Sequence, residues 1–452
     1  MRILFITKDF IIEPLGIMYL SAALKSAGHE TDIIKADVEN VEEKIKSFAP
    51  DIVTYSIITG AHKYFRDLNA ELKKKFNFIS VFGGPHATFF NEFIQGEGVD
   101  IICIGEGEGA IVDLANRLRD HKDFTDIPNL WVKRGDQIFK NPVRPLADIN
   151  SAVFPDRGLI YDKYAKSYNN PIKGFTGSRG CPYDCTFCYN GRLKEMYQQQ
   201  HGGAYLRVRS VDNLLEEIKQ VKEKYPMKMA YFQDDNLGIL PGWLEEFAPK
   251  YKKIINLPFH CNERADTITE KFANLLKEAG CSGVSIAIET ANDDLRNKIL
   301  KKHISREQII NAAKHIKRAG LHLRTYNILG IPQGSIKDDF ETLKLNVLCK
   351  ADMAWSTIYQ PYPRTQLGDQ VIKMGLYDGD FDKILETSYF GESPLNIPNR
   401  DKINNLQKLF TLTASFPFLL PLTKILINLP PNALFRKVYT FWKIRLNKKV
   451  YI

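Results

Sequence analysis

Residues 173–190 read KGFTGSRGCPYDCTFCYN, a short strand-like run followed by three cysteines within eight positions. Cys181, Cys185 and Cys188 have the spacing C-x3-C-x2-C, and no fourth cysteine lies close by. A structural zinc site needs four ligands, and ferredoxin-type runs also supply four thiolates to each cluster. Three thiolates can instead hold three irons of a 4Fe-4S cluster and leave the fourth iron open. A zinc site completed by a lone histidine or a distant cysteine remains the alternative.

The run at 173–180 is the first of six strand-like segments that alternate with helical ones. The other five lie at 227–236, 258–266, 283–290, 322–332 and 353–363. Six β/α units are too few to close an eight-stranded barrel, so the sequence predicts a partial, open barrel over residues 173–370. In such barrels the chemistry lies at the carboxyl ends of the strands, and the cysteines directly follow the first strand.

The first 145 residues form a separate β/α series. Their short apolar runs lie at 2–7, 30–36, 51–58, 78–84 and 99–109, with helical patterns between them. This alternation predicts a doubly wound, flavodoxin- or Rossmann-like α/β domain with a parallel sheet covered on both faces. The stretch 127–146 reads as a small hairpin. Residues 146–172 show little periodicity, and we expect them to be a linker.

The totals describe a globular protein of two or three domains: 452 residues, 44% hydrophobic and 25% charged. The amino terminus lacks the apolar run of a signal peptide, so we expect a cytoplasmic protein without disulfides. The four cysteines outside the motif are then expected to be small buried hydrophobes, namely Cys103, Cys261, Cys281 and Cys349. The net charge of +9 equals the charge of residues 402–452, which hold nine Lys or Arg and no Asp or Glu. The rest is close to neutral, which argues against a nucleic-acid partner.

The stretch CPYDCTFC resembles the signature of the radical S-adenosylmethionine (SAM) superfamily, with Phe187 in its aromatic place. The resemblance implies a 4Fe-4S cluster whose open iron is chelated by SAM, and a flavodoxin- or ferredoxin-type reductant. One electron from the cluster would cleave SAM to give a 5′-deoxyadenosyl radical. By the same resemblance, SAM-binding residues lie at the strand ends and in the motif: Phe187, Asp234, Asp235, Ser285, Glu289, Thr290 and Gly330.

Simpler interpretations of these strand ends stay open. Asp234 and Asp235 could belong to a solvated acidic loop. Arg264, in CNERAD, could face the cavity or be paired structurally with Asp266 or Glu263. The segment YQPYPRTQLG resembles a proline-rich family segment, with Arg364 in place of its usual glycine.

The order of the two domains resembles the cobalamin-binding subclass of these enzymes. The matching stretches are PLGIMYLSAALKSAGHE (14–30), SIITG (56–60), GGPHAT (83–88) and GEGE (105–108). The resemblance implies that a cobalamin is lined by Gly16, Ser56, Thr59, Gly83, Gly84, Glu106 and Gly107; tight βα turns are the alternative explanation of the glycines. The first loop, TKDFIIEPLG, contains no histidine, so we expect no axial cobalt ligand from it. We also expect His86 to be a polar loop residue and not a cobalt ligand.

Residues 371–452 are expected to form a helical, basic and apolar carboxyl-terminal region. The only charge from 409 to 435 is Lys424, but four prolines divide this stretch too finely for a membrane-spanning helix. Residues 434–450 then read as a short amphipathic basic helix. Two interpretations stay open: an interfacial helix in peripheral contact with a membrane, and a cap over the barrel mouth.

Together, the resemblances imply a cobalamin-dependent radical SAM enzyme that transfers a methyl group to an unactivated carbon of a small-molecule or lipid-like substrate. One SAM would methylate the cobalamin, and a second would give the radical. The domain order is equally similar to the anaerobic magnesium-protoporphyrin monomethyl ester cyclases, so oxidative cyclisation stays the enzymatic alternative. A non-enzymatic cobalamin or iron–sulfur sensor is the remote one.

Overall fold

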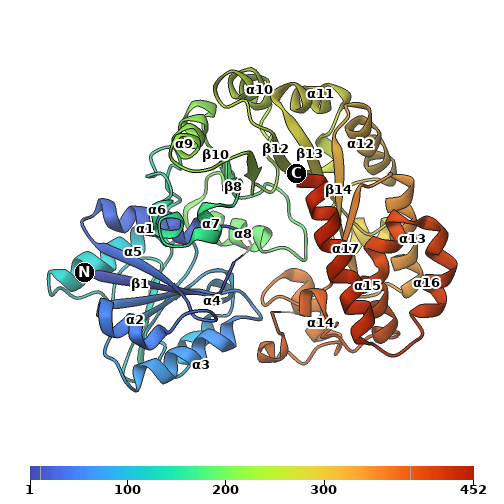
Figure 1. The fold of residues 1–452 in the computed structure, drawn as a ribbon. Helices are drawn as coiled ribbons and strands as arrows, with labels where there is room; N and C mark the ends of the chain where they lie inside the picture. The colour runs from blue at the N-terminus through green and yellow to red at the C-terminus, as the bar shows by residue number, and fades with distance from the viewer. Residues whose placement is uncertain (11, 387, 452) are drawn as a thin grey trace. The chain divides into compact units, whose positions relative to one another are not determined.

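The structure is a computed structural model that describes residues 1–10, 12–386 and 388–451, with side chains described up to residue 446 (Figure 1). The chain forms two compact units. The first comprises residues 1–174, 192–207 and 221–226, and the second comprises 175–191, 208–220 and 227–452. The four segments drawn from the sequence remain our proposal for the domain bounds.

The first unit is built on a seven-stranded sheet of order β2-β1-β3-β4-β5-β6-β7. Its parallel strands are β1 (Arg2–Thr7), β2 (Glu30–Lys35), β3 (Ile52–Ser56), β4 (Ile79–Gly83) and β5 (Ile101–Cys103). Strands β6 (Leu130–Arg134) and β7 (Gln137–Lys140) form the predicted hairpin and extend the sheet in an antiparallel manner beyond β5. The order 2-1-3-4-5 is that of the flavodoxin-like fold, which confirms the predicted class.

Helices cover both faces of this sheet, which is why its central strands β1, β3, β4 and β5 are largely apolar. Helices α1 (Leu15–Ser26) and α5 (Glu108–Arg119) pack together on one face, and α2 (Val41–Phe48) and α3 (His62–Lys73) lie on the other (Figure 1). The shorter elements of the unit are α4 (Pro85–Phe89), η1 (Asn91–Gln95), α6 (Gly158–Tyr161) and α7 (Ala165–Tyr168). Buried Glu13 ties the last part of the unit to the first loop, because it accepts hydrogen bonds from the Tyr161 hydroxyl (2.5 Å) and the Gly174 amide (2.7 Å).

The second unit contains a six-stranded sheet of order β15-β14-β13-β12-β11-β8. The strands are β8 (Ile172–Phe175), β11 (Met229–Phe232), β12 (Phe259–Glu263), β13 (Cys281–Glu289), β14 (His322–Leu329) and β15 (Met353–Ile358). The pairs from β11 to β15 are parallel, and the sheet does not close on itself, so the predicted partial barrel is confirmed. Helices line its outer side: α9 (Val211–Lys224), α10 (Trp243–Ile254), α11 (Glu270–Ala279), α12 (Arg306–Arg318) and α13 (Ile336–Leu348) (Figure 1).

Side chains of the barrel strands alternate between these helices and the inner face. On β14, Thr325 and Asn327 contact Asn346 of α13, which places the alternate residues Arg324 and Tyr326 on the inner face. The same alternation on β12 places His260 inside, where its Nε2 lies 2.7 Å from the Ser285 hydroxyl.

The chain after the barrel is helical, as predicted. It comprises α14 (Gln366–Lys373), η4 (Phe381–Lys383), η5 (Ser388–Phe390), α15 (Arg400–Ser415), η6 (Pro417–Leu419), α16 (Leu420–Leu426) and α17 (Ala433–Tyr451). Helix α15 packs on β15 and α13, and α17 packs on α15, β13 and β15. None of the helices in the described ranges combines the length and the apolarity that crossing a bilayer requires.

Candidate functional site

The three cysteines of the motif lie between β9 (Ser178–Arg179) and α8 (Tyr189–His201), after the first barrel strand. Their thiols are close enough to affect one another: a thiolate at Cys185 raises the pKa of both Cys181 and Cys188. Burial is the larger cause and raises these pKa values to about 11 and about 12. Thiols in such a site stay protonated until a metal displaces the proton.

This donor set fits a 4Fe-4S cluster with three protein ligands. Thiolates are the ligands that iron–sulfur clusters prefer, and each would bind a different iron. Within the described ranges, no three His, Cys, Asp or Glu side chains converge on a single metal position. The other four cysteines are free and buried, as predicted.

Thr186 fixes the centre of the cysteine loop. Its amide donates to the Leu300 carbonyl (3.1 Å), and its hydroxyl donates to the Ile299 carbonyl (2.6 Å). Its own carbonyl accepts from the Leu367 amide (2.9 Å). Since Thr186 is 2% exposed, these bonds are shielded from water, and the loop is held from both sides.

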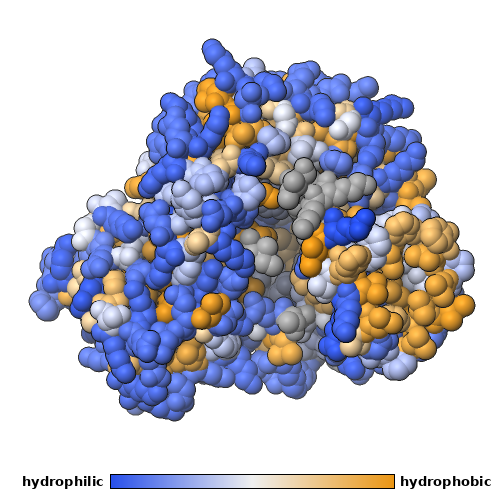
Figure 2. All heavy atoms as spheres, viewed as in Figure 1, coloured by the Kyte–Doolittle hydropathy of each residue, from blue (hydrophilic) through white to orange (hydrophobic). Residues whose placement is uncertain are grey.

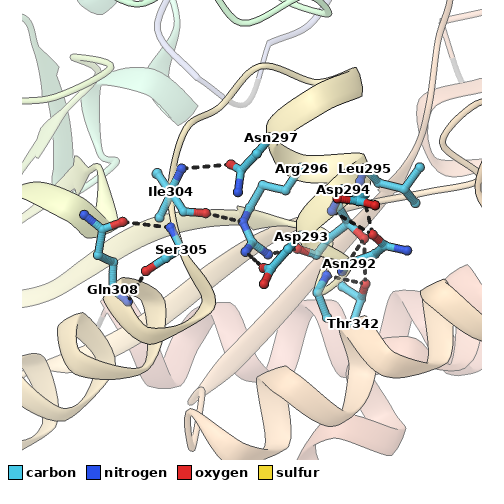
Figure 3. Close-up of polar contacts among 12 residues, drawn as sticks. Asn292, Asp293, Asp294, Leu295, Arg296, Asn297, Ile304, Ser305, Gln308 and Thr342 are labelled. Atoms are coloured by element: carbon cyan, nitrogen blue, oxygen red, sulfur yellow. Dashed lines mark hydrogen bonds and ion pairs between the residues drawn. The ribbon is translucent and has the colours of Figure 1, made fainter.

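The segment that receives Thr186 is in turn held by Arg296, a fully buried residue in the π-helical turn η3 (Leu295–Ile299) (Figure 3). The Arg296 guanidinium donates to the carbonyls of Thr290 and Ile304, each at 2.7 Å, and pairs with Asp293. Arg296 therefore links the two ends of the loop after β13, at Thr290 and Ile304. π-Helical turns such as η3 are frequent at functional sites.

A buried ion pair lies at the end of β13, beside the cysteines. Lys302 donates to Glu289 at 2.7 Å, and both side chains are at most 8% exposed. Glu289 follows an irregular register in β13 and has φ +61, a left-handed conformation that is uncommon for a non-glycine residue. Burial raises the pKa of Cys185, and the positive charges of Lys302 and Arg264 oppose that rise.

Arg264 resolves one of the open alternatives. Its guanidinium pairs with Asp266 through two bonds of 3.0 and 3.1 Å and lies 3.5 Å from the ring centre of Tyr183, inside the cysteine motif. Glu263 is not its partner: that carboxyl accepts from the Gly238 amide, and burial raises its pKa to about 8. Arg264 is thus structurally paired and also touches the loop that carries the three cysteines.

The two adjacent carboxylates after β11 have different surroundings. Asp234 is buried, accepts from the Gly177 amide and the Ser178 hydroxyl (2.5 Å), and has a pKa raised to about 6 by burial. Asp235 accepts from Asn190 at 2.7 Å, and its charge raises the pKa values of Cys181 and Cys188. Of the two, Asp235 is the one with its carboxylate near the thiols.

The other residues predicted to bind SAM also fall into two groups: some lie on the inner face of the barrel or near the cysteines, and others pack against the outer helices. Ser285 lies on the inner face of the barrel and contacts His260. Thr290 is buried against Thr342 of α13 (3.3 Å), and Gly330 has φ +68 and donates its amide to Asp339. Phe187 is half-buried in the motif. Glu289, Asp235 and the cysteines are therefore brought together, whereas Thr290 and Gly330 face the surrounding helices, and their contacts with SAM stay predictions.

In the first unit, the predicted cobalamin residues gather at the carboxyl ends of β3, β4 and β5 and at the start of α1. Gly84 has φ +94, and a Cβ there would lie 2.7 Å from the Ile57 carbonyl oxygen, so only glycine fits. Gly83 ends β4, exposed Ser56 ends β3, and a Cβ on Gly16 would meet open space. Neighbouring parallel strands end at one edge, which is where an open α/β sheet binds ligands.

Thr59, one of the residues predicted to line cobalamin, already contacts another side chain of the protein. Thr59 is buried and its hydroxyl lies 2.9 Å from Nδ1 of His86, which stacks on His62 with ring centres 3.8 Å apart. His86 is thus fully buried in α4 and not in a loop, which corrects the expectation for this residue.

At the end of β5, Glu106 forms an ion pair with Arg207, and its amide donates to the Tyr197 hydroxyl at 2.9 Å. Gly107 follows directly, and a Cβ there would lie 3.4 Å from Cys103 Sγ. Arg207, Tyr197 and Lys302 were not singled out in the sequence. Arg207 and Tyr197 reach Glu106 from a distant part of the chain, and Lys302 reaches Glu289 across the turn after β13.

Comparisons with known proteins agree with this architecture. Models of the Radical SAM superfamily and the B12 binding domain match residues 175–345 and 1–115. An uncharacterized methyltransferase of Pyrococcus horikoshii is 30% identical over 375 residues, which are 80% of this chain and 79% of the relative. The anaerobic magnesium-protoporphyrin IX monomethyl ester cyclase of Rubrivivax gelatinosus is 26% identical over 381 residues, 79% of this chain and 67% of that protein.

A similar fold is found in a solved structure, the radical SAM methyltransferase TsrM from Kitasatospora setae with cobalamin and a [4Fe-4S] cluster bound. Its TM-score is 0.68 and its sequence is 14% identical. The match covers 82% of this chain and 78% of the TsrM chain. The two matched domains, their order and the extent of the first relative establish the family. This chain belongs to the cobalamin-dependent radical SAM methyltransferase family, whose cofactors are a 4Fe-4S cluster, SAM and cobalamin.

Proposed function

We propose that this enzyme transfers a methyl group to a carbon atom of a small organic substrate held inside the barrel. The observation that carries the proposal is the loop of three mutually close thiols, with the Lys302–Glu289 pair beside it, in a chain that also has a cobalamin-binding domain. When bound, the cluster and SAM supply a carbon-centred radical, and cobalamin carries the methyl group. A flavodoxin- or ferredoxin-type protein serves as the electron donor.

The residues of the chain bind and orient these groups. Lys302 and Arg264 place positive charge beside Cys185, which offsets the negative charge of a thiolate-bound cluster. Asp235 and Glu289 offer carboxylates to the ammonium group of SAM. The aromatic inner face, which includes Tyr231 and Tyr326, excludes water from the space in which a radical would otherwise be quenched.

Product analysis tests the proposal. The protein is reconstituted anaerobically with iron, sulfide and hydroxocobalamin and is then given dithionite and SAM. We expect both 5′-deoxyadenosine, which reports radical formation, and S-adenosylhomocysteine, which reports methylation of cobalamin. Formation of 5′-deoxyadenosine without S-adenosylhomocysteine would favour the alternative of oxidative cyclisation; the Rubrivivax gelatinosus relative is named as a cyclase. If protein with an intact cluster forms neither product, the result would favour the interpretation of the chain as a non-enzymatic sensor.

We also propose that this enzyme is cytoplasmic and that it rests on an anionic membrane through its carboxyl-terminal helices. Four apolar side chains on successive turns from η6 onward are strongly exposed: Phe418 (76%), Leu422 (48%), Ile425 (68%) and Leu429 (47%). Figure 2 shows a cluster of hydrophobic surface on this part of the second unit. Residues 402–452 carry nine basic and no acidic side chains, so the apolar face is accompanied by charges that attract anionic lipid.

The cap interpretation is compatible with this contact, because α17 has two apolar faces. Phe435 and Leu446 are buried towards the rest of the unit, whereas Leu434, Phe441 and Ile444 are more than half exposed. One face of the helix can therefore cover the barrel while the other meets lipid.

Vesicle sedimentation measures the membrane contact. We expect the protein to sediment with phosphatidylglycerol vesicles and not with phosphatidylcholine vesicles, and the double variant Phe418→Asp/Ile425→Asp to lose about tenfold or more of the binding. The matched control is Ile254→Asp, because Ile254 is 43% exposed on α10. Wild-type protein that ignores phosphatidylglycerol vesicles would refute the proposal.

A further inference from the structure

The inner face of the barrel carries a cation among aromatic rings, near the amino ends of the strands. Arg324 is the third residue of β14, is 8% exposed and points inward. Its guanidinium carbon lies 4.7 Å from the ring centre of Trp355 and 5.0 Å from that of Tyr326. Trp355 and Tyr326 are direct neighbours in the pairing of β14 with β15, so the two strands build one aromatic surface.

Helix α17 adds a second cation to the same surface. The Lys443 ammonium lies 4.6 Å from the ring centres of Trp355 and Phe390 and 5.7 Å from that of Tyr439. Two positively charged side chains, one from a strand and one from the terminal helix, therefore contact a single indole ring. Aromatic faces attract cations, but they do not remove the repulsion between two of them.

The positive charge of Lys443 is not neutralised by a nearby carboxylate of any described residue. In the described part of the chain, no carboxylate lies within ion-pair distance of Lys443. Burial and then the charge of Arg324 lower the pKa of Lys443, and burial and then Arg324 lower that of His260 to about 3. The neighbouring Lys408 differs, because its ammonium donates to the carbonyls of Phe390 and Gly391 and to Gln407.

We propose that Arg324 and Lys443 bind an anionic group of the substrate, a carboxylate or a phosphate, and that the surrounding rings pack against its apolar body. An anion that contacts both cations would offset their repulsion through two charge-assisted contacts. This assignment of substrate class rests on the proposed function, since it takes the bound molecule to be the substrate.

The distance between the anion site and the cysteine loop implies that the substrate is elongated. Arg324 is six residues before Gly330, which follows the carboxyl end of β14, and a strand rises about 3.3 Å per residue, so roughly 20 Å separates the two levels. The cysteine loop follows β8 on the carboxyl side of the sheet. A substrate that reaches both levels is elongated, with its acidic group near α17 and its reacting carbon near the cluster.

Calorimetric titration of the reconstituted holoenzyme tests the site with three ligands of one ring system: 1-naphthoate, 1-naphthyl phosphate and neutral 1-naphthol. We expect the anions to bind about tenfold or more tightly than the naphthol, because only they meet both cations. The tighter of the two anions identifies the group as a carboxylate or a phosphate. Equal affinity for all three ligands, or no binding of either anion, would overturn the proposal.

Variants separate an anion site from cations that only attach α17 to the barrel. Arg324→Gln and Lys443→Gln should each raise the dissociation constants of the anions about tenfold and leave that of naphthol unchanged. Arg324→Lys and Lys443→Arg keep the charge and should retain most of the affinity, while Lys437→Gln on the exposed side of α17 is the matched control. Unchanged anion binding in both glutamine variants would refute the site.

The failure of this proposal is distinguishable from failure of the proposed function. A protein that forms no 5′-deoxyadenosine refutes the enzyme assignment and leaves the naphthoate affinities as measured. A protein that forms 5′-deoxyadenosine and S-adenosylhomocysteine but prefers naphthol refutes only the anionic substrate.

Discussion

Replacing Cys185 by alanine will leave the protein without its 4Fe-4S cluster and will abolish 5′-deoxyadenosine formation. The Cys185 thiol interacts electrostatically with both Cys181 and Cys188, and the described residues near them offer no substitute group of metal ligands. Alanine supplies no donor, so one iron loses its only protein ligand. Iron and sulfide content, the visible absorption of the cluster and product chromatography measure the result.

Two controls make the Cys185→Ala result specific. Cys349→Ala removes a buried cysteine after α13 and should keep the cluster. Hydroxocobalamin should still bind to Cys185→Ala, because the cobalamin-binding domain matches residues 1–115. A Cys185→Ala protein that keeps a full cluster would contradict the ligand assignment.

Arg296→Met is expected to destabilise the second unit by about 3–5 kcal/mol, because it removes a buried cation that satisfies the carbonyls of Thr290 and Ile304. Methionine fills a similar volume, so the change tests the hydrogen bonds more than the packing. Urea unfolding followed by circular dichroism measures the free energy. Lys298→Met, an exposed lysine in the same turn, should change it by no more than about 0.5 kcal/mol.

Cluster content gives the Arg296 variant a second readout. Because the carbonyls that hold Thr186 belong to the last residue of η3, Ile299, and to Leu300 after it, we expect Arg296→Met to lose iron faster than wild type under mild chelation. Arg296→Lys, which keeps a charge but only one donor group, should fall between the two. A Met variant that is as stable as wild type and retains its iron would show that the loop after β13 does not need the guanidinium.

Features encoded by short stretches of sequence were predictable. The spacing of the three cysteines is local, and the β/α periodicity identified both sheets and the open barrel before any contact was known. A tight turn after β4 was one of the two explanations that the sequence offered for Gly84, and the close approach of the Ile57 carbonyl agrees with it. Each of these signals depends on residues that are close in the chain.

The rest depends on pairings between distant segments. Nothing around Lys302 distinguishes it from the many other lysines, and only the folded chain brings it to Glu289. Asp234 and Asp235 are chemically identical in the sequence, yet one serves the turn after β8 and the other lies near the thiols. The meeting of Lys443 with Trp355 likewise requires α17 to pack on the barrel strands.

The bonds of Thr186 have a consequence for the life of the enzyme. Thr186, at the centre of the cysteine loop, makes three hydrogen bonds within the chain, so we expect the loop to keep its shape without iron, in contrast to small domains that fold only around their metal. Oxygen that destroys the cluster would then remove the iron and sulfide but leave the folded loop that binds them. We therefore expect one polypeptide to accept a new cluster from iron and sulfide after the first has been lost.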